Sequence, residues 1–379
     1  MTSAALLTDL YELTMSAALF AEGRAEVPVT FSLFVRSLPP SRGYLVVAGL
    51  EDVLDHLDRL AFTEEDRVGL ASLGLFDRAF LDWLGGVRFT GTVRAIPEGR
   101  IAFHAEPLVE VTAPFAVAQM LETYLLNQVT YQTVLATKAA RCRHAAGGRP
   151  VVDFSLRRTH GAEAGMRVAR ASAIVGLAGT SNVAAALRYG FPASGTMAHS
   201  YVSAHAAWGA GGEGGRAGGE ATELDAFRTF ARHYRADPVL LVDTYDTLIG
   251  IDRAIVVARE LEEAGRRLAG VRLDSGDIAT LARAARERLD AAGLPGVRII
   301  ASGGIDEYEI DRLLSEGAPL DGFGVGTRLG TSEDAPSLET VYKLVEVAGL
   351  PVAKRSEGKA STGGAKQVWR RPGFGGDVV

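Results

Sequence analysis

The sequence predicts an α/β protein with a closed or nearly closed (β/α) barrel and a second α/β domain formed by both chain ends. From residue 150 onward, short apolar strands alternate with helical segments, which is the pattern of βα units around a parallel sheet. About seven such units, with no GxGxxG motif after the first strand, favour a barrel over an open sheet. Strand-like segments return after residue 337, so we expect the tail to complete the N-terminal domain.

The N-terminal domain is assigned to residues 1–135 and 338–379. An amphipathic helix is expected at 6–20, and the alternation of residues 27–35 predicts a half-buried strand. Segments 87–96 and 101–111 flank the turn sequence PEGR and predict a hairpin. Pro114 opens a helical region to residue 146, with a break expected around Thr130. The other predicted elements are a strand at 43–48, helices at 50–60, 63–73 and 77–84, and tail strands at 337–348, 352–354 and 367–369.

The barrel domain is assigned to residues 136–337. Asp306 followed by Glu309 marks a helix start, because a side-chain acceptor satisfies free N–H groups and acidic groups favour a helix N-terminus. The glycine-rich segment 209–219 is interpreted as a mobile loop, with a surface insertion favoured over a lid. The predicted strands of this domain lie at 151–154, 173–179, 194–198, 239–242, 271–273, 298–301 and 322–325.

Composition excludes several classes of protein. The net charge of −6 over 379 residues argues against a general nucleic-acid binder. The single cysteine, Cys142, excludes an internal disulfide and fits a reducing compartment, and no histidine pair has the spacing of a structural zinc site. The apolar N-terminus lacks a basic region and is interrupted by Asp9 and Glu12, which argues against a signal peptide, and no stretch is long enough to span a bilayer. We therefore expect a cytoplasmic enzyme without nucleic-acid or membrane partners.

The stretch GVRLDSGDIAT at 270–280 is the clearest candidate for chemistry. A short apolar strand ends in Arg272, Asp274, Ser275 and Asp277, and a helical pattern follows. Charged groups at the end of a buried strand are costly unless they meet a ligand, a metal or each other. The C-terminal ends of the strands are also where βα-barrels carry their active sites.

Polar residues or glycines follow the end of each predicted barrel strand, and we expect them to face one shared pocket. They are Asp153, Phe154 and Arg157; Gly179, Thr180, Ser181 and Asn182; His199 and Ser200; Asp243, Thr244 and Asp246; Arg272, Asp274 and Asp277; Ser302, Gly303 and Gly304; and Gly324, Gly326 and Thr327. The last two sets predict a phosphate site, because glycines allow close approach and N–H groups at a helix start bind phosphate. The alternative is that these segments are only tight βα turns.

Three further features each leave two interpretations open. Asp243, Asp274 and Asp277 could hold Mg²⁺ through carboxylate oxygens, although helix capping is favoured for Asp277. His199 could act as a base, metal ligand or phosphoryl acceptor, or could be a structural histidine; its position at a strand end favours a functional role. A basic tail segment is either an anion site or a solvated strand face. Its cations are Lys354, Arg355, Lys359, Lys366, Arg370 and Arg371, against one acid, Glu357.

Taken together, these residues resemble nicotinate phosphoribosyltransferases. The resemblance runs along nearly the whole chain in family order, and the combination is highly specific although each motif alone is not. The motifs are LLTDLYELTM, FSLFVRSLPP, GYLVVAGLE, ATKAARCR, DFSLRRTHGAEAG, GTSNVAAALRYGFPASGTMAHS, LLVDTYDTLIG, RLDSGD, ASGGIDEY, FGVGT and KRSEGKASTGGAKQVWR.

The resemblance implies transfer of the 5-phosphoribosyl group from PRPP to the ring nitrogen of nicotinate, the entry step of NAD salvage. It also implies coupling to ATP hydrolysis through a phosphohistidine at His199. The implied fold is the irregular (β/α) barrel of type II phosphoribosyltransferases with an α/β domain from both chain ends. A homodimer with shared active sites is implied as well.

The resemblance also implies roles for individual residues. Tyr11 would reach the partner subunit's site and stack on the pyridine ring opposite Phe154. Arg157 and Arg272 would supply positive charge, and Asp274 would bind the ribose hydroxyls or the metal. The other implied substrate-binding residues are Thr180, Ser181, Ser302, Gly303, Gly304, Gly324, Gly326, Thr327 and Lys354, with Asp243 helping to hold Mg²⁺.

Ser181 distinguishes between related substrates. Enzymes of this kind that use nicotinamide carry an aspartate at the matching position, and a carboxylate there would repel nicotinate, so the neutral serine favours the acid. Quinolinate is disfavoured because the quinolinate enzymes lack the histidine of the MAHS segment. Two other classes remain as alternatives. One is a sugar-phosphate lyase that forms a Schiff base on Lys138, and the other is a catalytically silent nucleotide-binding regulator.

Overall fold

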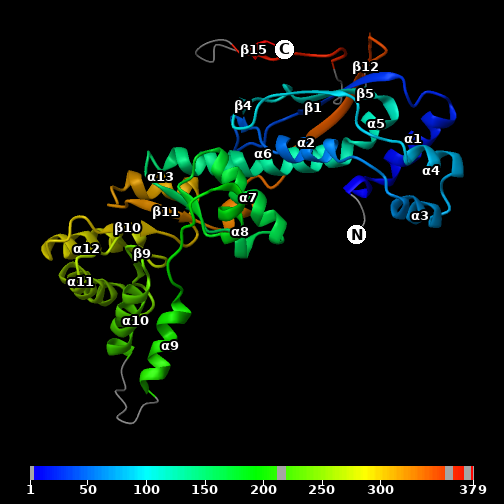
Figure 1. Ribbon diagram of the computed structural model, residues 1–379. Helices are drawn as coiled ribbons and strands as arrows, with labels where there is room; N and C mark the ends of the chain where they lie inside the picture. The colour runs from blue at the N-terminus through cyan, green and yellow to red at the C-terminus, as the bar shows by residue number, and fades with distance from the viewer. Residues whose placement is uncertain (1–3, 211–218, 355–361, 371–376, 379) are drawn as a thin grey trace. The chain divides into compact units, whose positions relative to one another are not determined.

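The computed structural model describes residues 4–210, 219–354, 362–370 and 377–378, which form two compact units (Figure 1). Residues 1–137 and 334–379 make up the first unit, and residues 138–333 make up the second. The boundary falls inside helix α6 (Glu122–Ala145). Most of the glycine-rich segment predicted at 209–219 lies outside the described residues, as do Arg355, Lys359 and Arg371 of the basic tail.

The first unit contains a five-stranded antiparallel sheet in the order β13-β12-β1-β5-β3. Strand β12 comes from the tail and pairs with β1 from Val35 opposite Thr340 to Val29 opposite Val347. Phe31 of β1 and Tyr342 of β12 stack with ring centroids 4.6 Å apart in the core. The strands are β1 (Pro28–Val35), β3 (Thr92–Ala95), β5 (Pro107–Pro114), β12 (Thr340–Val347) and β13 (Leu350–Pro351), with the separate pairs β2 (Leu45–Val46) with β4 (Ile101–Ala102) and β14 (Trp369–Arg370) with β15 (Asp377–Val378).

Two local predictions for this unit need correction. The helical region after Pro114 breaks at Leu121 and not around Thr130, which lies inside α6, because a single β-branched residue lowers helix propensity only slightly. The predicted hairpin pairs as β3 with β5, but the segment after the PEGR turn pairs with β2 instead. The helices are η1 (Ala4–Leu6), α1 (Leu10–Ala21), α2 (Leu50–Asp58), α3 (Glu64–Ser72), α4 (Arg78–Leu84) and α5 (Phe115–Met120).

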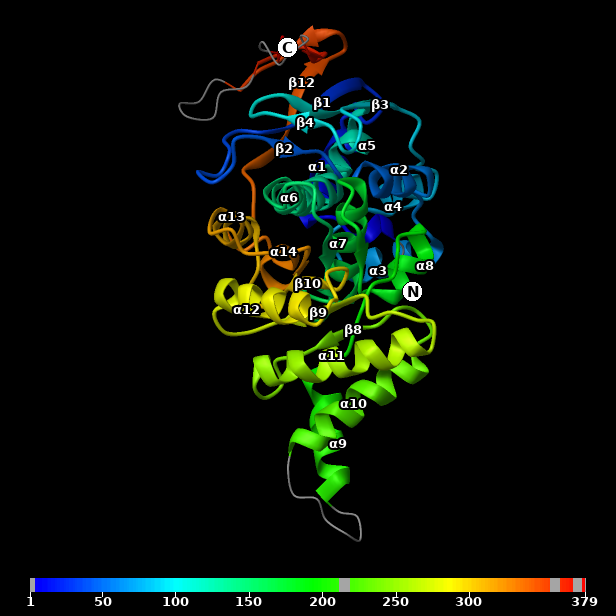
Figure 2. The same ribbon diagram turned by 90° about the vertical axis from the view of Figure 1, so that its left-hand side faces the viewer.

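The second unit is built on a six-stranded parallel sheet in the order β7-β6-β11-β10-β9-β8. Figure 2 labels three of its strands, β8, β9 and β10. The predicted α/β fold with βα units and a parallel sheet is confirmed, and the sheet is a curled half-barrel. Its strands are β6 (Val151–Asp153), β7 (Gly179–Thr180), β8 (Val239–Leu241), β9 (Gly270–Leu273), β10 (Arg298–Ala301) and β11 (Gly322–Val325). Its helices are η2 (Leu156–Arg158), α7 (Ala162–Ile174), α8 (Val183–Tyr189), α9 (His199–Ala210), α10 (Gly219–His233), α11 (Thr247–Glu263), α12 (Ile278–Ala291), α13 (Glu307–Ser315) and α14 (Thr327–Gly330).

The predicted irregular (β/α) barrel of the type II phosphoribosyltransferase kind is confirmed. Its sheet is a half-barrel among the described residues and is not closed, because two predicted strands do not form as expected. Residues up to Ile174 belong to α7, so the strand predicted at 173–179 is reduced to Gly179–Thr180. The strand predicted at 194–198 is represented only by an isolated bridge between Thr180 and Ala193. Thr180 donates to the Pro192 oxygen and accepts from the Ser194 N–H, and Gly195, which has no side chain to pack, follows where this pairing stops. No helix among the described residues is both long enough and apolar enough to cross a membrane.

Candidate active site

The carboxyl ends of β8, β9 and β10 meet at one edge of the half-barrel. Asp243, the second residue after β8, accepts hydrogen bonds on Oδ2 from the backbone N–H of Asp274 (3.0 Å) and the hydroxyl of Ser275 (2.6 Å). The Ser302 hydroxyl, directly after β10, donates to Asp274 Oδ1 at 2.5 Å. Neighbouring parallel strands therefore bring these three positions into one hydrogen-bonded cluster, as the sequence pattern predicted.

Arg272 places a cation in the same cluster. Its guanidinium donates to Thr196 Oγ1 at 2.8 Å and lies 4.0 Å from Asp274 Oδ1. The guanidinium carbon also lies over the Phe154 ring, 5.9 Å from its centroid. Burial lowers the pKa of Arg272, partly offset by the nearby carboxylates of Asp274 and Asp243. Its Nε has no hydrogen-bond partner among the described residues, so the side chain retains a donor for an anionic ligand.

Phe154 owes its position to Gly324 on the adjacent strand β11. A Cβ at Gly324 would lie 2.4 Å from the Phe154 ring, so only glycine leaves room for the ring against the sheet. The packing of Phe154 is therefore enough to explain why residue 324 is glycine, with no need for a bound phosphate at this position. Gly326 lies beyond it, at the start of α14 before Thr327.

Asp153 and Thr180 join the ends of the neighbouring strands β6 and β7 by a side-chain hydrogen bond. The carboxylate of Asp153 accepts from the Ser155 N–H at 2.9 Å and from the Thr180 hydroxyl at 2.7 Å, and burial raises its pKa. Thr180 is fully buried, and its Oγ1 accepts from the Asn182 N–H at 3.0 Å. Its hydroxyl is therefore committed to the strand end, and of the predicted pair the half-buried Ser181 is the more accessible.

His199 is the first residue of α9 and is half-buried. Its Nδ1 lies 3.1 Å from the hydroxyl of Thr244, the residue after Asp243. Thr196, three residues earlier, is the partner of Arg272. The imidazole is thus held next to the segments that carry the carboxylates and the guanidinium, and it is not isolated on another surface.

The turn at 302–304 brings two loops very close together. Gly303 has φ of +83°, and a Cβ there would lie 1.9 Å from the backbone oxygen of Asp274. Gly304 also has positive φ, +64°, with no atom near its missing Cβ. Backbone N–H groups in glycine turns are groups that bind anions in many proteins.

Four predicted site residues remain, and of these Arg157 lies near enough to Arg272 for its charge to add to burial in lowering the pKa of Arg272. Arg157 in η2 is exposed. Tyr11 on α1 and Lys354 both belong to the first unit, and both are exposed. Asp277 caps α12 by accepting from the Thr280 N–H, as its favoured interpretation predicted.

The basic tail also lines a hollow in the first unit. Lys366 and Arg370 face it together with Arg94 and Arg100, around a volume of about 490 Å³. Glu110 in the same hollow accepts from the Lys366 N–H. Of the two interpretations of this tail, a cation-lined hollow agrees better with an anion site than with a flat strand face.

Some contacts of the site could not be predicted from the sequence pattern. Thr196 was not recognised as the partner of Arg272, because its segment was expected to be a strand. Asp306 was recognised only as a helix cap, although its carboxylate also approaches Lys138 and Arg328. The buried ion pair of Lys138 with Asp306 could have been predicted from ATKAARCR, where a lysine stands among small and apolar residues of a helix, because a buried lysine needs an acidic partner.

A parallel half-barrel that carries a guanidinium, an aromatic ring, carboxylates and glycine turns at one edge defines an enzyme for phosphorylated, anionic substrates. The sequence matches the model of the nicotinate phosphoribosyltransferase N-terminal domain over residues 6–130 and that of the nicotinate phosphoribosyltransferase family over residues 150–370. The chain belongs to the nicotinate phosphoribosyltransferase family.

Individual relatives agree with this assignment. A nicotinate phosphoribosyltransferase of Mycobacterium tuberculosis is 50% identical over 369 residues, covering 97% of this chain and 75% of the relative. The nicotinate phosphoribosyltransferase of Bacillus subtilis is 40% identical, covering 97% of this chain and 73% of the relative. The crystal structure of human nicotinic acid phosphoribosyltransferase superposes with a TM-score of 0.80 at 34% identity, covering 91% of this chain and 75% of that one.

Proposed function

We propose that the protein transfers the 5-phosphoribosyl group of PRPP to the ring nitrogen of nicotinate, yielding nicotinate mononucleotide and pyrophosphate for NAD synthesis. The bond between the anomeric carbon and the pyrophosphate oxygen breaks, and the bond from that carbon to the ring nitrogen forms. The observation that carries the proposal is the meeting of Arg272, Phe154 and Asp274 beside the Gly303 turn, in a chain 50% identical to a named nicotinate phosphoribosyltransferase.

The side chains suit a displacement in which positive charge develops on the ribose. Nicotinate stacked on Phe154 would have its carboxylate near the Arg272 guanidinium, with Arg157 adding positive charge. The Asp274 carboxylate would bind the ribose hydroxyls and stabilise the cation-like anomeric carbon. Gly303, Gly304 and Gly326 would offer backbone N–H groups to the 5′-phosphate. Holding both substrates in place supplies much of the rate enhancement of such a reaction.

Magnesium fits this site as a partner of the pyrophosphate. Asp243 is nearly buried, and its Oδ1 has no hydrogen-bond partner among the described residues. No group of three or more potential metal-ligating residues occurs in the described part of the chain. Mg²⁺ commonly binds through one or two carboxylates together with substrate phosphates, so Asp243 and Asp274 would be its protein ligands. The ion would neutralise charge on the leaving pyrophosphate.

ATP is proposed as a co-substrate that phosphorylates His199. Hydrogen bonding of Nδ1 to Thr244 would fix the ring and leave Nε2 as the phosphoryl acceptor. The Arg272 guanidinium would then be close enough to interact with the negative charge of the phosphoryl group on His199. Phosphorylation would then improve the use of PRPP without forming the glycosidic bond.

Replacement of His199 tests this role. We expect His199→Ala to keep slow transfer of the phosphoribosyl group and to lose stimulation by ATP, because the histidine carries the phosphoryl group and not the ribosyl group. The measurement is the initial rate of nicotinate mononucleotide formation with and without ATP. His205→Ala, on the same helix, serves as the control and should respond to ATP as the parent does. Unchanged stimulation in His199→Ala would remove this residue from the scheme.

A homodimer with shared active sites is proposed from the exposed surface of α1. Leu10, Tyr11 and Met15 on this helix and Leu7 before it are exposed apolar side chains, the kind of surface that a second copy would cover. Tyr11 would stack on nicotinate in the partner subunit, and Lys354 would add a cation there. Light scattering should give twice the chain mass of 40.1 kDa.

The reaction itself is tested by incubating the protein with PRPP and Mg²⁺, with and without ATP, and following pyrophosphate. We expect release with nicotinate and little with nicotinamide or quinolinate, because Ser181 places no carboxylate near the ring substituent. Equal rates with nicotinamide would contradict the choice of substrate. If none of the three pyridine compounds leads to release of pyrophosphate, the remaining interpretation is a catalytically silent nucleotide-binding regulator.

A barrel lyase is disfavoured by the structure. Lys138 is fully buried and its Nζ lies 2.5 Å from a carboxylate oxygen of Glu307, so its amine is held as a charged ion-pair partner. A Schiff base needs an accessible, neutral amine.

A further inference from the structure

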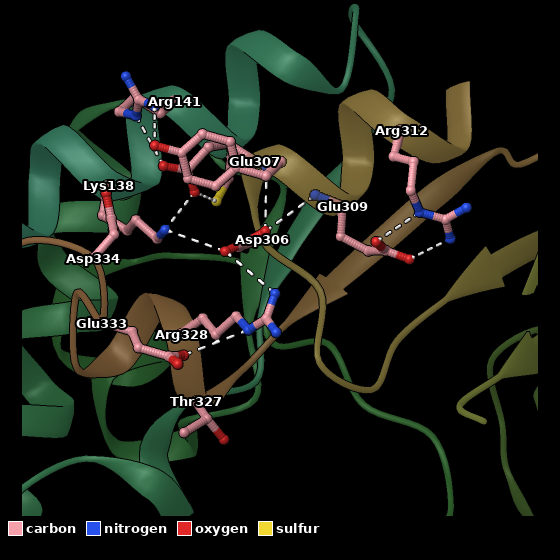
Figure 3. A network of polar contacts seen from close by, with 12 residues as sticks. Lys138, Arg141, Asp306, Glu307, Glu309, Arg312, Thr327, Arg328, Glu333 and Asp334 are labelled. Carbon is pink, nitrogen blue, oxygen red and sulfur yellow. Dashed lines mark hydrogen bonds and ion pairs between the residues drawn. The ribbon is translucent and has the colours of Figure 1, made fainter. Parts of the chain in front are cut away.

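A network of charged side chains joins helices α6, α13 and α14 of the second unit (Figure 3). Asp306 Oδ2 is 3.5 Å from Lys138 Nζ and 3.4 Å from Arg328 Nη1. Glu307 contacts Lys138 Nζ at 2.5 Å with one oxygen and accepts from Arg141 Nε at 2.8 Å with the other. Lys138 is fully buried, and Asp306 and Glu307 are each about 5% exposed. Arg328 also lies 3.4 Å from Glu333.

Asp306 performs two structural tasks with one carboxylate. Its Oδ1 caps α13 by accepting from the N–H groups of Tyr308 (3.2 Å) and Glu309 (3.1 Å). Its Oδ2 meets the cations of α6 and α14. A carboxylate bound on both oxygens by partners from three helices has little freedom to move, so the start of α13 is fixed.

The residues on either side of this network belong to two different loops. Asp306 ends the turn that begins with Ser302, Gly303 and Gly304, while Arg328 is the second residue after Gly326. The ion pair between Asp306 and Arg328 therefore joins the loop after β10 to the loop after β11. Among the described residues, no hydrogen bond or ion pair joins either side chain to Phe154 or Arg272.

We propose that Asp306, Arg328 and Lys138 are positioning residues that hold these two glycine loops at a fixed separation, so that both present N–H groups to the 5′-phosphate of PRPP. This inference rests on the proposed function. Glycines at positive φ leave the first loop intrinsically adaptable, and a phosphate is bound well only when its donors are held before it arrives. The Asp306 carboxylate is buried between the buried Lys138 and the half-buried Arg328, and ion pairs held in this way favour one conformation, which here is the arrangement of the loops.

Arg328→Met and Asp306→Asn test the link. Methionine keeps the stem of Arg328 without its charge, and asparagine retains the capping oxygen of Asp306 while weakening its ion pairs. We expect each to raise KM for PRPP about tenfold, the low end of what loss of a supporting partner costs, with kcat and KM for nicotinate changed less than about threefold. Arg328→Lys should recover part of the loss, because it restores the charge.

Arg312→Met is the matched control. Arg312 lies on α13 and pairs with Glu309 (Figure 3). It also pairs with Glu316, and no ion pair joins it to Asp306 among the described residues. This variant loses the same charge from the same region and should keep the KM for PRPP of the parent. A rise equal to that of Arg328→Met would contradict the proposal, since a general effect of removing charge near α13 would then explain both.

The double variant Asp306→Asn/Arg328→Met decides whether the two residues act through each other. Residues that act as one link should give about the tenfold rise of either single variant, whereas independent effects should multiply to about a hundredfold. A hundredfold rise, or a rise in KM for nicotinate as large as that for PRPP, would overturn the proposal. Thermal unfolding of each variant establishes that the chain is folded.

Binding of PRPP with Mg²⁺, followed by calorimetry, separates this inference from the proposed reaction. If the parent binds PRPP but transfers nothing to nicotinate, the proposed reaction is wrong. Weaker PRPP binding by Arg328→Met than by the parent would still support the link between the loops in that case. If the parent transfers the ribosyl group and Arg328→Met binds PRPP as tightly as the parent does, the link is wrong and the reaction stands.

Discussion

Replacement of Arg272 by alanine should lower kcat/KM for nicotinate about a thousandfold, the upper range for loss of one electrostatic donor at a reacting centre. Its guanidinium is the cation that contacts both the Phe154 ring and the Asp274 carboxylate. Removing it would take positive charge from beside the nicotinate carboxylate and leave Asp274 without its cationic neighbour. The measurement is steady-state pyrophosphate release over a range of nicotinate concentrations.

Two further substitutions control for this result. Arg272→Lys retains the charge without the planar, multiple donors, so an intermediate loss is expected. Arg283→Ala removes an arginine of α12 that donates to the backbone oxygen of Glu316 outside the site, and it should leave the rate unchanged. An Arg272→Ala enzyme within tenfold of the parent would mean that the guanidinium does not face the substrates.

Substitution of Gly303 by alanine should reduce kcat/KM more than about a hundredfold, in the range that loss of a properly placed electrostatic group produces. The added Cβ would lie 1.9 Å from the backbone oxygen of Asp274, so the loop after β9 or the loop after β10 must move. Either movement changes the position of Asp274 relative to Ser302 and breaks the hydrogen bond between them. Activity and thermal unfolding are measured on the same preparation.

Gly317→Ala separates this clash from the general cost of positive φ. Gly317 has φ of +70°, follows α13, and has no atom near its missing Cβ. Its substitution should destabilise the fold by about 1–2 kcal/mol, the cost of a left-handed residue, with normal activity. If Gly303→Ala loses no more activity than this control, the close approach of the two loops has no part in catalysis.

Much of the site could be predicted because its residues follow a simple rule of parallel sheets. Strand ends at Asp243, Arg272 and Ser302 were expected to meet, and hydrogen bonds join Asp243 and Ser302 to Asp274. The partner of Arg272 could not be found in this way. Thr196 lies in a segment whose apolar pattern fits a strand, and strand formation also depends on a neighbour with which to pair.

The sequence by itself determined the family, the βα pattern of the second unit and the chemical types of residue at the strand ends, because periodicity, helix caps and motifs are local properties of the chain. Only the tertiary structure decided that the parallel sheet is a half-barrel, that Gly324 makes room for Phe154, and that Asp306 joins Lys138 to Arg328. These features depend on which residues distant in the chain come into contact, and such contacts are set by the packing of whole elements.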